Sequence, residues 1–171
     1  LIWHKKHDNA IYWIDFSPNG QHIASAGASN VISIWDTVGD ADPLLLKGHS
    51  NRIQGISFGP DGQYLVSGSY DKTVRIWDTE TGSEIKRFDI GEIIRNVSFS
   101  PNGKYIASKS TKTITIWDIT TGLKNWFPQE ATGNNSGLTF SPDGNTIIVN
   151  DKENLIKCYN VKFFYNFQLH G

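Results

Sequence analysis

Short segments in which apolar and polar residues alternate follow one another along the chain, separated by turns rich in Gly, Pro, Asn and Asp. The residues that lead to a recurring Phe show the alternation, with Ile53, Gly55 and Ser57 set against Ile56 and Phe58. A period of two is the pattern of a β-strand with one face more apolar than the other. The pattern therefore predicts a succession of short strands.

A turn segment recurs four times and divides the chain into similar units. It reads Phe-Ser-Pro-Asn/Asp-Gly, with Gly in place of Ser in the second copy, and its spacings are 42, 41 and 41 residues, counted from Phe16, Phe58, Phe99 and Phe140. Pro fixes φ for the second position of a type I turn, Asn or Asp tolerates the third, and Gly accepts the positive φ that follows. The chain must therefore reverse at each copy.

A second marker runs in step with the first. Its spacings are 42, 40 and 42 residues, and its copies are Trp35-Asp36, Trp77-Asp78, Trp117-Asp118 and the degenerate Tyr159-Asn160. Between the two markers we expect a second apolar strand, at 21–26, 63–68, 104–108 and 145–150, and then a third strand rich in β-branched residues. A fourth strand follows the Asp. Four short strands cannot bury both faces alone, so successive units must stack side by side.

Units of this length with Gly-His near the start and Trp-Asp at the end resemble the WD-repeat β-propeller family. The match is best in the second unit, which has Gly48-His49 and Trp77-Asp78. The resemblance implies an all-β fold of WD-type blades, each of four antiparallel strands, with about four blades present. We treat residues 1–171 as a single propeller segment with approximate repeats at 4–46, 47–87, 88–128 and 129–171.

The resemblance also implies a hydrogen-bonded network inside each blade. In the family it links a His, a Ser or Thr of the second strand, an Asp in the next turn and the Trp, which here are His49, Ser67, Asp71 and Trp77. The other units depart from it: His7, Ser25, Ser29 and Trp35; Ile90, Ser108, Thr111 and Trp117; Ala131, Val149, Glu153 and Tyr159. We expect the joint loss of His and Asp in the last two units to avoid an unsatisfied buried member.

Charge and composition exclude several classes of function. The chain has 16 Lys and Arg against 17 Asp and Glu, and a net charge of -1 argues against a general nucleic-acid binder. No apolar run approaches the roughly 20 residues of a membrane span. The single cysteine, Cys158, excludes an internal disulfide and favours a reducing compartment, so we expect a cytoplasmic protein.

Catalytic chemistry finds little support in the sequence. A Ser, a His and an Asp occur in the expected network, but the Ser belongs in mid-strand beside an indole and no oxyanion hole is suggested. The five histidines lack metal-ligand spacing, no phosphate-binding loop is present, and the first strands offer Asp15 and little else for a catalytic channel. We therefore predict no enzyme, no metal and no cofactor.

A binding surface is expected at one end of the blades. In the resembled family, peptides bind at residues that enter the first strand and at the turn between the second and third strands. Alignment on the Phe marker places Tyr12, Gln54 and Arg95 at one such position, with Arg52 and Tyr70 beside them. Aromatic and Arg side chains suit an interaction hot spot. The alternative is that these are ordinary rim residues.

The function that we expect is a non-enzymatic scaffold that presents blade loops to protein partners. An alternative is a structural or sensor module within a larger multidomain signalling protein or assembly, and a propeller enzyme is less favoured.

Four blades are few for a closed ring, since propellers have four to eight and the resembled family usually has seven. The chain lacks Met, begins with Leu1-Ile2-Trp3, which aligns with a fourth strand at 44–46, and ends in the aromatic run 163–167. Further blades could come from a longer chain, from a second copy that makes eight blades, or from other subunits. The mid-unit start favours the first.

Overall fold

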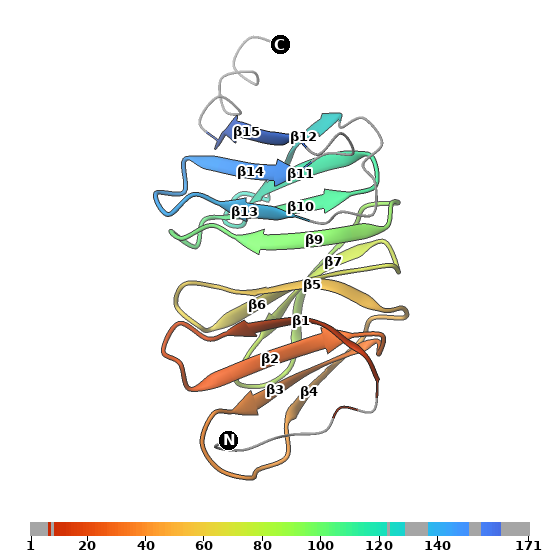
Figure 1. The fold of residues 1–171 in the computed structure, drawn as a ribbon, viewed down its shortest axis with the longest axis vertical. Coiled ribbons are helices and arrows are strands. Elements are labelled where there is room, and N and C mark those ends of the chain that lie inside the picture. Colours follow the sequence, from red (N-terminus) through yellow and green to blue (C-terminus); the bar gives the residue numbers. More distant parts are fainter. Residues whose placement is uncertain (1–6, 8, 123, 129–136, 151–154, 162–171) are drawn as a thin grey trace.

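The computed structural model describes residues 7, 9–122, 124–128, 137–150 and 155–161, and its strands form four separate antiparallel sheets (Figure 1). In each sheet the strands are neighbours in chain order. Blade 1 contains β1 (Ile11–Phe16), β2 (His22–Gly27), β3 (Val31–Asp36) and β4 (Leu44–Lys47). Blade 2 contains β5 (Ile53–Phe58), β6 (Tyr64–Ser69), β7 (Thr73–Asp78) and β8 (Glu84–Asp89).

The other two sheets repeat this plan. Blade 3 contains β9 (Ile94–Phe99), β10 (Tyr105–Ser110), β11 (Thr113–Asp118) and β12 (Lys124–Pro128). Blade 4 has three strands in the described part of the chain, β13 (Leu138–Phe140), β14 (Thr146–Asn150) and β15 (Ile156–Asn160). The all-β class is confirmed, and so are the four-stranded antiparallel blades expected from the sequence for blades 1, 2 and 3.

The recurring turn segment reverses the chain between the first and second strands of each blade. In blade 1 the amide of Gly20 donates to the carbonyl of Ser17 over 2.8 Å, and Gly20 has a φ of 70°. The side chain of Asn19 accepts the amide of Gln21 at 3.0 Å. That bond keeps Gln21 in the turn, so β2 begins one residue later than expected. The same Asn or Asp cap delays β6, β10 and β14 by one residue.

The first strand of a blade does not alternate strictly, which corrects the sequence analysis. Ile53 pairs with Ser69 and Gly55 with Gly68, so Gln54 forms a β-bulge. A bulge leaves one residue unpaired and shifts all residues before it to the other face. Ile53 therefore lies on the same face as Ile56 and Phe58, not opposite to them. Alternation cannot reveal such a bulge, because it depends on the pairing with the neighbouring strand.

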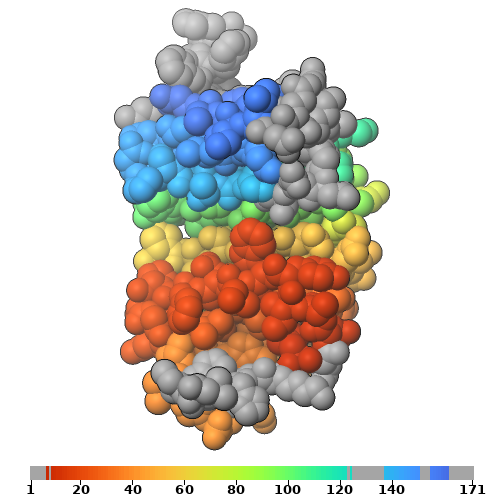
Figure 2. Space-filling model, viewed as in Figure 1, coloured from red at the N-terminus to blue at the C-terminus, as the bar shows by residue number. Residues whose placement is uncertain are grey.

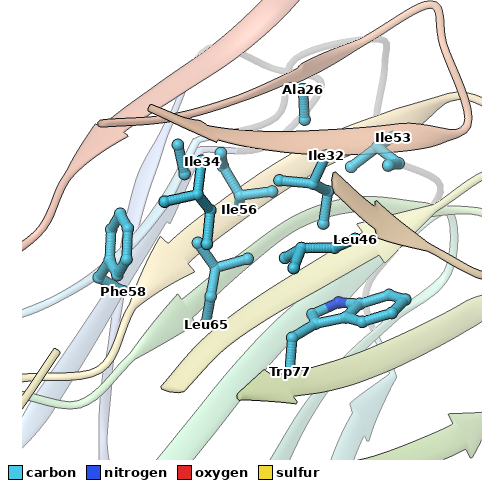
Figure 3. Packing of buried hydrophobic residues seen from close by; sticks show 10 residues of the cluster. Ala26, Ile32, Ile34, Leu46, Ile53, Ile56, Phe58, Leu65 and Trp77 are labelled. Carbon is cyan, nitrogen blue, oxygen red and sulfur yellow. The ribbon is translucent and has the colours of Figure 1, made fainter. Parts of the chain in front are cut away.

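Each blade buries one face against the next. We call the face that contacts the preceding blade the upstream face and the opposite one the downstream face. Figure 3 shows downstream side chains of blade 1 (Ala26, Ile32, Ile34 and Leu46) pointing toward upstream side chains of blade 2 (Ile53, Ile56, Leu65 and Trp77). A second core lies between blades 2 and 3, and a third between blades 3 and 4.

The innermost strands β1, β5, β9 and β13 lie side by side, each in contact with the next (Figure 1). Blade 1 and blade 4 extend from them in opposite directions, and the ring is not closed. The segments 1–3 and 163–167, which the sequence analysis assigned to the two ends of the stack, lie outside the described residues.

Candidate functional site

The bulges at the start of the first strands carry three of the predicted binding residues. Register shifts occur between Ile11 and Trp13 in β1, at the start of β5, and between Ile94 and Asn96 in β9. The unpaired residues are Tyr12, Gln54 and Arg95. Bulges commonly re-aim a side chain next to a functional site, and here they place corresponding side chains at the same end of successive blades.

The turn between β6 and β7 is fastened to the residues that lead into β5. The amide of Tyr70 donates to the carbonyl of Arg52 over 3.0 Å, and the hydroxyl of Ser69 reaches the same carbonyl at 2.9 Å. Lys72 takes a left-handed conformation, with φ of 71°. The turn is therefore tight, and it fixes Tyr70 beside the start of β5.

Arg52, Tyr70 and Arg95 form one cluster, which we call the rim cluster. The Cζ atom of Arg52 lies 3.8 Å from the centroid of the Tyr70 ring, and that of Arg95 lies 4.9 Å from it. A guanidinium nitrogen of Arg95 also donates to the Tyr70 hydroxyl. Cations over an aromatic face are attracted by the quadrupole of the ring. The cluster joins blade 2 to blade 3.

The rim cluster carries unbalanced positive charge. Among the described residues, neither Arg52 nor Arg95 forms an ion pair with a carboxylate, whereas Arg75 and Arg87 each do. Arg52 is exposed, and Tyr70 and Arg95 are half-buried. Two guanidinium groups on one ring repel each other, and an anionic group placed between them would relieve that repulsion.

The structure thus brings three of the five predicted binding residues together. Tyr12 is exposed at the bulge of blade 1, and Gln54 is half-buried at the bulge of blade 2. Within the described ranges, neither of these side chains makes a hydrogen bond or ring contact with the rim cluster.

Beneath this end of blade 2 lies the network expected from the sequence. The indole nitrogen of Trp77 donates to the Ser67 hydroxyl at 2.8 Å. The Ser67 oxygen lies 2.7 Å from Nε2 of His49, and Nδ1 of His49 lies 2.7 Å from the carboxylate of Asp71. Because Nδ1 faces a carboxylate, it carries the proton, and Nε2 accepts from the serine. All four side chains meet in the expected order.

Burial and pairing set the charges in this network. Burial lowers the pKa of His49 below its ordinary value, although Asp71 acts in the opposite direction. Burial alone would raise the pKa of Asp71, but hydrogen bonds from His49 and Thr73 outweigh it and hold that pKa well below its usual range. The network therefore contains a neutral imidazole and an ionised carboxylate at neutral pH.

The network extends further than the family pattern indicates. Arg75, in the middle of β7, donates through Nε to the Thr73 hydroxyl at 3.1 Å and through Nη1 to Glu84 at 2.6 Å. Its other terminal nitrogen lies 3.4 Å from Asp71. The sequence offered one signal for this extension, a charged residue, Arg75, amid the apolar run of β7. Its partner Glu84 could not be identified from the sequence, because the contact depends on how β8 pairs with β7.

The Ser67, His49 and Asp71 geometry does not make a hydrolytic site. Ser67 is fully buried, and its oxygen is already bonded to both Trp77 and His49. A nucleophile must reach its substrate, so this arrangement holds the blade together. The network anchors Asp71, which follows Tyr70 in the chain, and in this way it supports the rim cluster.

Blade 1 keeps part of the network. Trp35 donates to Ser25 at 2.8 Å, and Nε2 of His7 lies 2.9 Å from the same oxygen. Ser29 occupies the position of Asp71 and accepts the amide of Val31 at 2.9 Å, as Asp71 accepts that of Thr73. The imidazole of His7 therefore has no carboxylate at the position that Asp71 occupies beside His49.

Blade 3 contradicts the expectation that no buried polar group is left without a hydrogen-bond partner when His and Asp are lost together. The Ser108 hydroxyl is buried and has no hydrogen-bond partner in the described part of the chain. A different bond fastens the turn: Glu92 accepts the Ser110 hydroxyl at 2.5 Å and the amide of Lys112 at 3.1 Å. In blade 4 the corresponding Ala131 and Glu153 lie outside the described residues.

Asp15, the acidic residue noted in the first strands, joins two blades. Its carboxylate accepts the amide of Phe58 at 2.8 Å, and burial raises its pKa, partly offset by that bond. Among the described residues we find no group of three or more side chains able to hold a metal ion, and no helix with the length and hydropathy of a membrane span.

A family model described as "WD domain, G-beta repeat" matches residues 2–36, 43–78 and 84–118, more than half of the chain. The last two ranges each begin at the fourth strand of one blade and end at the Trp-Asp pair of the next. Sequence repeats and blades are therefore offset by one strand, which ties neighbouring blades together. No curated protein matches the chain significantly.

Proposed function

Since the chain belongs to the WD40 repeat family, whose members generally mediate protein-protein interaction, we propose that it is a non-enzymatic scaffold that presents its blade loops to protein partners. The observation that carries this proposal is the rim cluster, in which Arg52 and Arg95 contact the same Tyr70 ring. Tyr12 and Gln54, at the neighbouring bulges, widen the proposed surface.

The rim cluster supports a partner with acidic side chains. A carboxylate can take two parallel hydrogen bonds from a guanidinium, and such bonds are stronger than neutral ones. Arg52 and Arg95 have no carboxylate partner among the described residues, so an incoming Asp or Glu would displace no ion pair of the described part of the protein. Tyr70 adds a flat apolar surface beside them. Aromatic and Arg side chains dominate interaction hot spots.

The rim cluster also rests on a rigid support. Asp71 follows Tyr70 directly and is held by His49, by Thr73 and by the amide of Ser50. A preorganised surface loses less conformational entropy on binding. The network of blade 2 therefore contributes to binding by positioning Tyr70, without touching the partner.

Selection from a displayed random peptide library tests the proposal. Peptides that bind the protein should be enriched in Asp and Glu and should bind the Arg52→Ala and Arg95→Ala variants at least tenfold more weakly. Arg87→Ala is the matched control, because Arg87 is exposed on β8 and pairs only locally with Asp89. If selected peptides bind both rim variants as well as they bind the control, the rim cluster is not the binding surface.

A second candidate is a structural or sensor module within a larger multidomain signalling protein or assembly, which the exposure of Ile14 and Phe16 on the upstream face of blade 1 supports. We propose that the protein binds neither specific nucleic acids nor membranes. We also propose that it is located in the cytoplasm. Cell fractionation would test the location. If a metal analysis found one tightly held metal ion per chain, that result would favour a propeller enzyme over a scaffold.

A further inference from the structure

Two hollows lie between neighbouring blades at the end of the strands that carries the recurring turns. This end is opposite to the rim cluster, because each turn joins the end of a first strand to the start of a second one. In Figure 2 the turn-bearing ends follow one another along the left edge, from blade 1 (red) to blade 4 (blue). A groove of about 640 Å³ lies between blades 1 and 2, and a pocket of about 260 Å³ lies between blades 2 and 3.

The pocket between blades 2 and 3, which we call the apolar pocket, has walls of apolar side chains. Ile85 of blade 2 faces Phe99 and Ile119 of blade 3 across it. Ile85 forms a β-bulge, because its neighbours Glu84 and Lys86 pair with adjacent residues of β7. A bulge re-aims a side chain, and Ile85 lines the pocket while 55% of its surface stays exposed. The pocket therefore presents unburied apolar surface between two blades that are both present.

Two positions of the apolar pocket depart from the repeat in a way that enlarges it or removes polar atoms. Gly59 has no side chain, and a Cβ atom there would lie 3.7 Å from the Phe99 ring. The other three turns have Ser at this position, namely Ser17, Ser100 and Ser141. Ile119 stands where Thr37 and Thr79 of blades 1 and 2 donate to carbonyls of the preceding turn. The repeat alone therefore does not produce this pocket.

The groove between blades 1 and 2, which we call the acidic groove, adjoins the apolar pocket, since Asp61 lines both. Among the described residues, no Lys or Arg lines the groove, and His22 contacts Asp36 at 2.9 Å. The carboxylates that line it are Asp36, Asp42, Asp61, Asp78 and Glu80. A cleft lined by charges of one sign concentrates their electric field and attracts the opposite charge.

We propose that the two hollows together bind a protein segment that is rich in Lys or Arg and carries one large apolar side chain. The apolar side chain fills the pocket beside Ile119, and the basic side chains lie along the acidic groove. The pocket is smaller than those that enclose a whole small-molecule ligand, so its volume suits a single side chain. Charge complementarity decides which segments bind, and an anchor in an apolar pocket supplies most of the affinity.

This surface is separate from the rim cluster and selects the opposite charge. Asp61 and the other carboxylates repel an acidic segment, whereas Arg52 and Arg95 attract one. Lys86 also lines the apolar pocket, and its Nζ lies 5.2 Å from the centroid of the Phe88 ring. The protein can therefore hold two different segments at its two ends.

Selection from a displayed random peptide library, followed by fluorescence anisotropy of the selected peptides, tests the proposal. The wild type should select a class of peptides rich in Lys and Arg with one large apolar residue. Ile119→Thr should weaken their binding about tenfold or more, because the pocket loses part of an apolar wall. Asp61→Asn should weaken it about two- to fivefold, because it removes one exposed ion pair. Both substitutions introduce residues that other blades have at these positions, Thr79 and Asn19.

Each of these variants has a matched control. Ile90→Thr changes another half-buried Ile that packs against the same core but does not line the pocket. Asp143→Asn makes the same change in the corresponding turn of blade 4. Both controls should bind the basic peptides like the wild type, and so should Arg52→Ala, which impairs only the rim cluster. Circular dichroism checks that each variant is folded.

A peptide in which Gly replaces the apolar residue distinguishes an anchored segment from general attraction between charges. It should bind the wild type about tenfold or more weakly than the parent peptide does, and it should bind Ile119→Thr as it binds the wild type. A selection without basic peptides would overturn the proposal. It would also be overturned by a Gly peptide that binds as tightly as its parent, or by Ile119→Thr binding the parent as the wild type does.

Discussion

Blades 1 and 2 share residue types at the same positions of one repeat, yet they differ in two respects. The upstream apolar face is exposed in blade 1 and buried in blade 2. Among the described residues, the polar network of blade 1 reaches only as far as His7, whereas in blade 2 it continues through His49 to Asp71 and Arg75. The comparison shows that the sequence of a blade specifies which face is apolar, while its neighbour decides whether that face is buried.

The largest expected difference between the two blades follows from burial. Ile56→Ala should lower the free energy of unfolding by about 2–5 kcal/mol, because it leaves a cavity between blades. Ile14→Ala removes the same atoms from the exposed face and should cost within about 0.5 kcal/mol. Urea denaturation followed by Trp fluorescence in dilute solution measures both. Equal losses would mean that the two faces are buried alike.

The network of blade 2 gives the next largest effect. Asp71→Asn removes the charge that accepts from His49 and Thr73 and should cost about 1.5–3 kcal/mol. Asp89→Asn is the control, because Asp89 forms an exposed ion pair with Arg87, which is worth at most about 1 kcal/mol. The same denaturation experiment applies. If the two variants lose equal stability, the network does not contribute as we infer.

The network also makes stability depend on pH. The pKa of His49 is lowered in the folded state. Below about pH 6.5, His49 therefore binds a proton in the unfolded chain but not in the folded chain, so the free energy of unfolding decreases as the pH falls. Because the pKa of Asp71 is also lowered, stability falls again below about pH 4. Asp15 acts in the opposite direction, because burial raises its pKa.

Unfolding curves measured from pH 7.5 to pH 3 test this dependence. Asp71→Asn should lose less stability than the wild type between pH 5 and pH 3, and Asp89→Asn should follow the wild type. Parallel curves for all three proteins would assign the acid sensitivity to other groups, such as Asp143, whose pKa is lowered to about 2 by hydrogen bonds from Ser141 and Asn145.

The smallest expected effect is an increase in stability from a substitution in blade 1. Ser29→Asp places a carboxylate at the position of Asp71, where it can retain the bond from Val31 and accept from His7. We expect the free energy of unfolding to rise by up to about 1 kcal/mol, with Ser29→Ala as the control. A loss of stability in Ser29→Asp would show that His7 does not occupy the place that His49 has in blade 2.

Local sequence signals predicted the strands and the network well. The Phe-Ser-Pro-Asn/Asp-Gly turn and the Trp-Asp pair bracket each blade, and both act through neighbouring residues. His49, Ser67, Asp71 and Trp77 were found because a repeated pattern places them at fixed offsets. Features of this kind need no knowledge of the neighbouring blade.

Features that depend on pairing across strands were missed. The bulge at Gln54 moved Ile53 to the opposite face, and the bond between Arg75 and Glu84 follows from the register of two strands. The unsatisfied Ser108 was not expected either, because the packing around a lost partner leaves no trace in a repeat pattern. The rim cluster was predicted as positions, but the stacking of Arg52 and Arg95 on Tyr70 was not.

Hydroxyl-radical footprinting of Phe16 and Phe58, read by mass spectrometry over a range of protein concentrations, tests most directly whether a neighbouring blade determines burial. Phe58 should stay protected at every concentration, while Phe16 should react readily in dilute solution. Equal reactivity of the two rings in dilute solution would contradict the account.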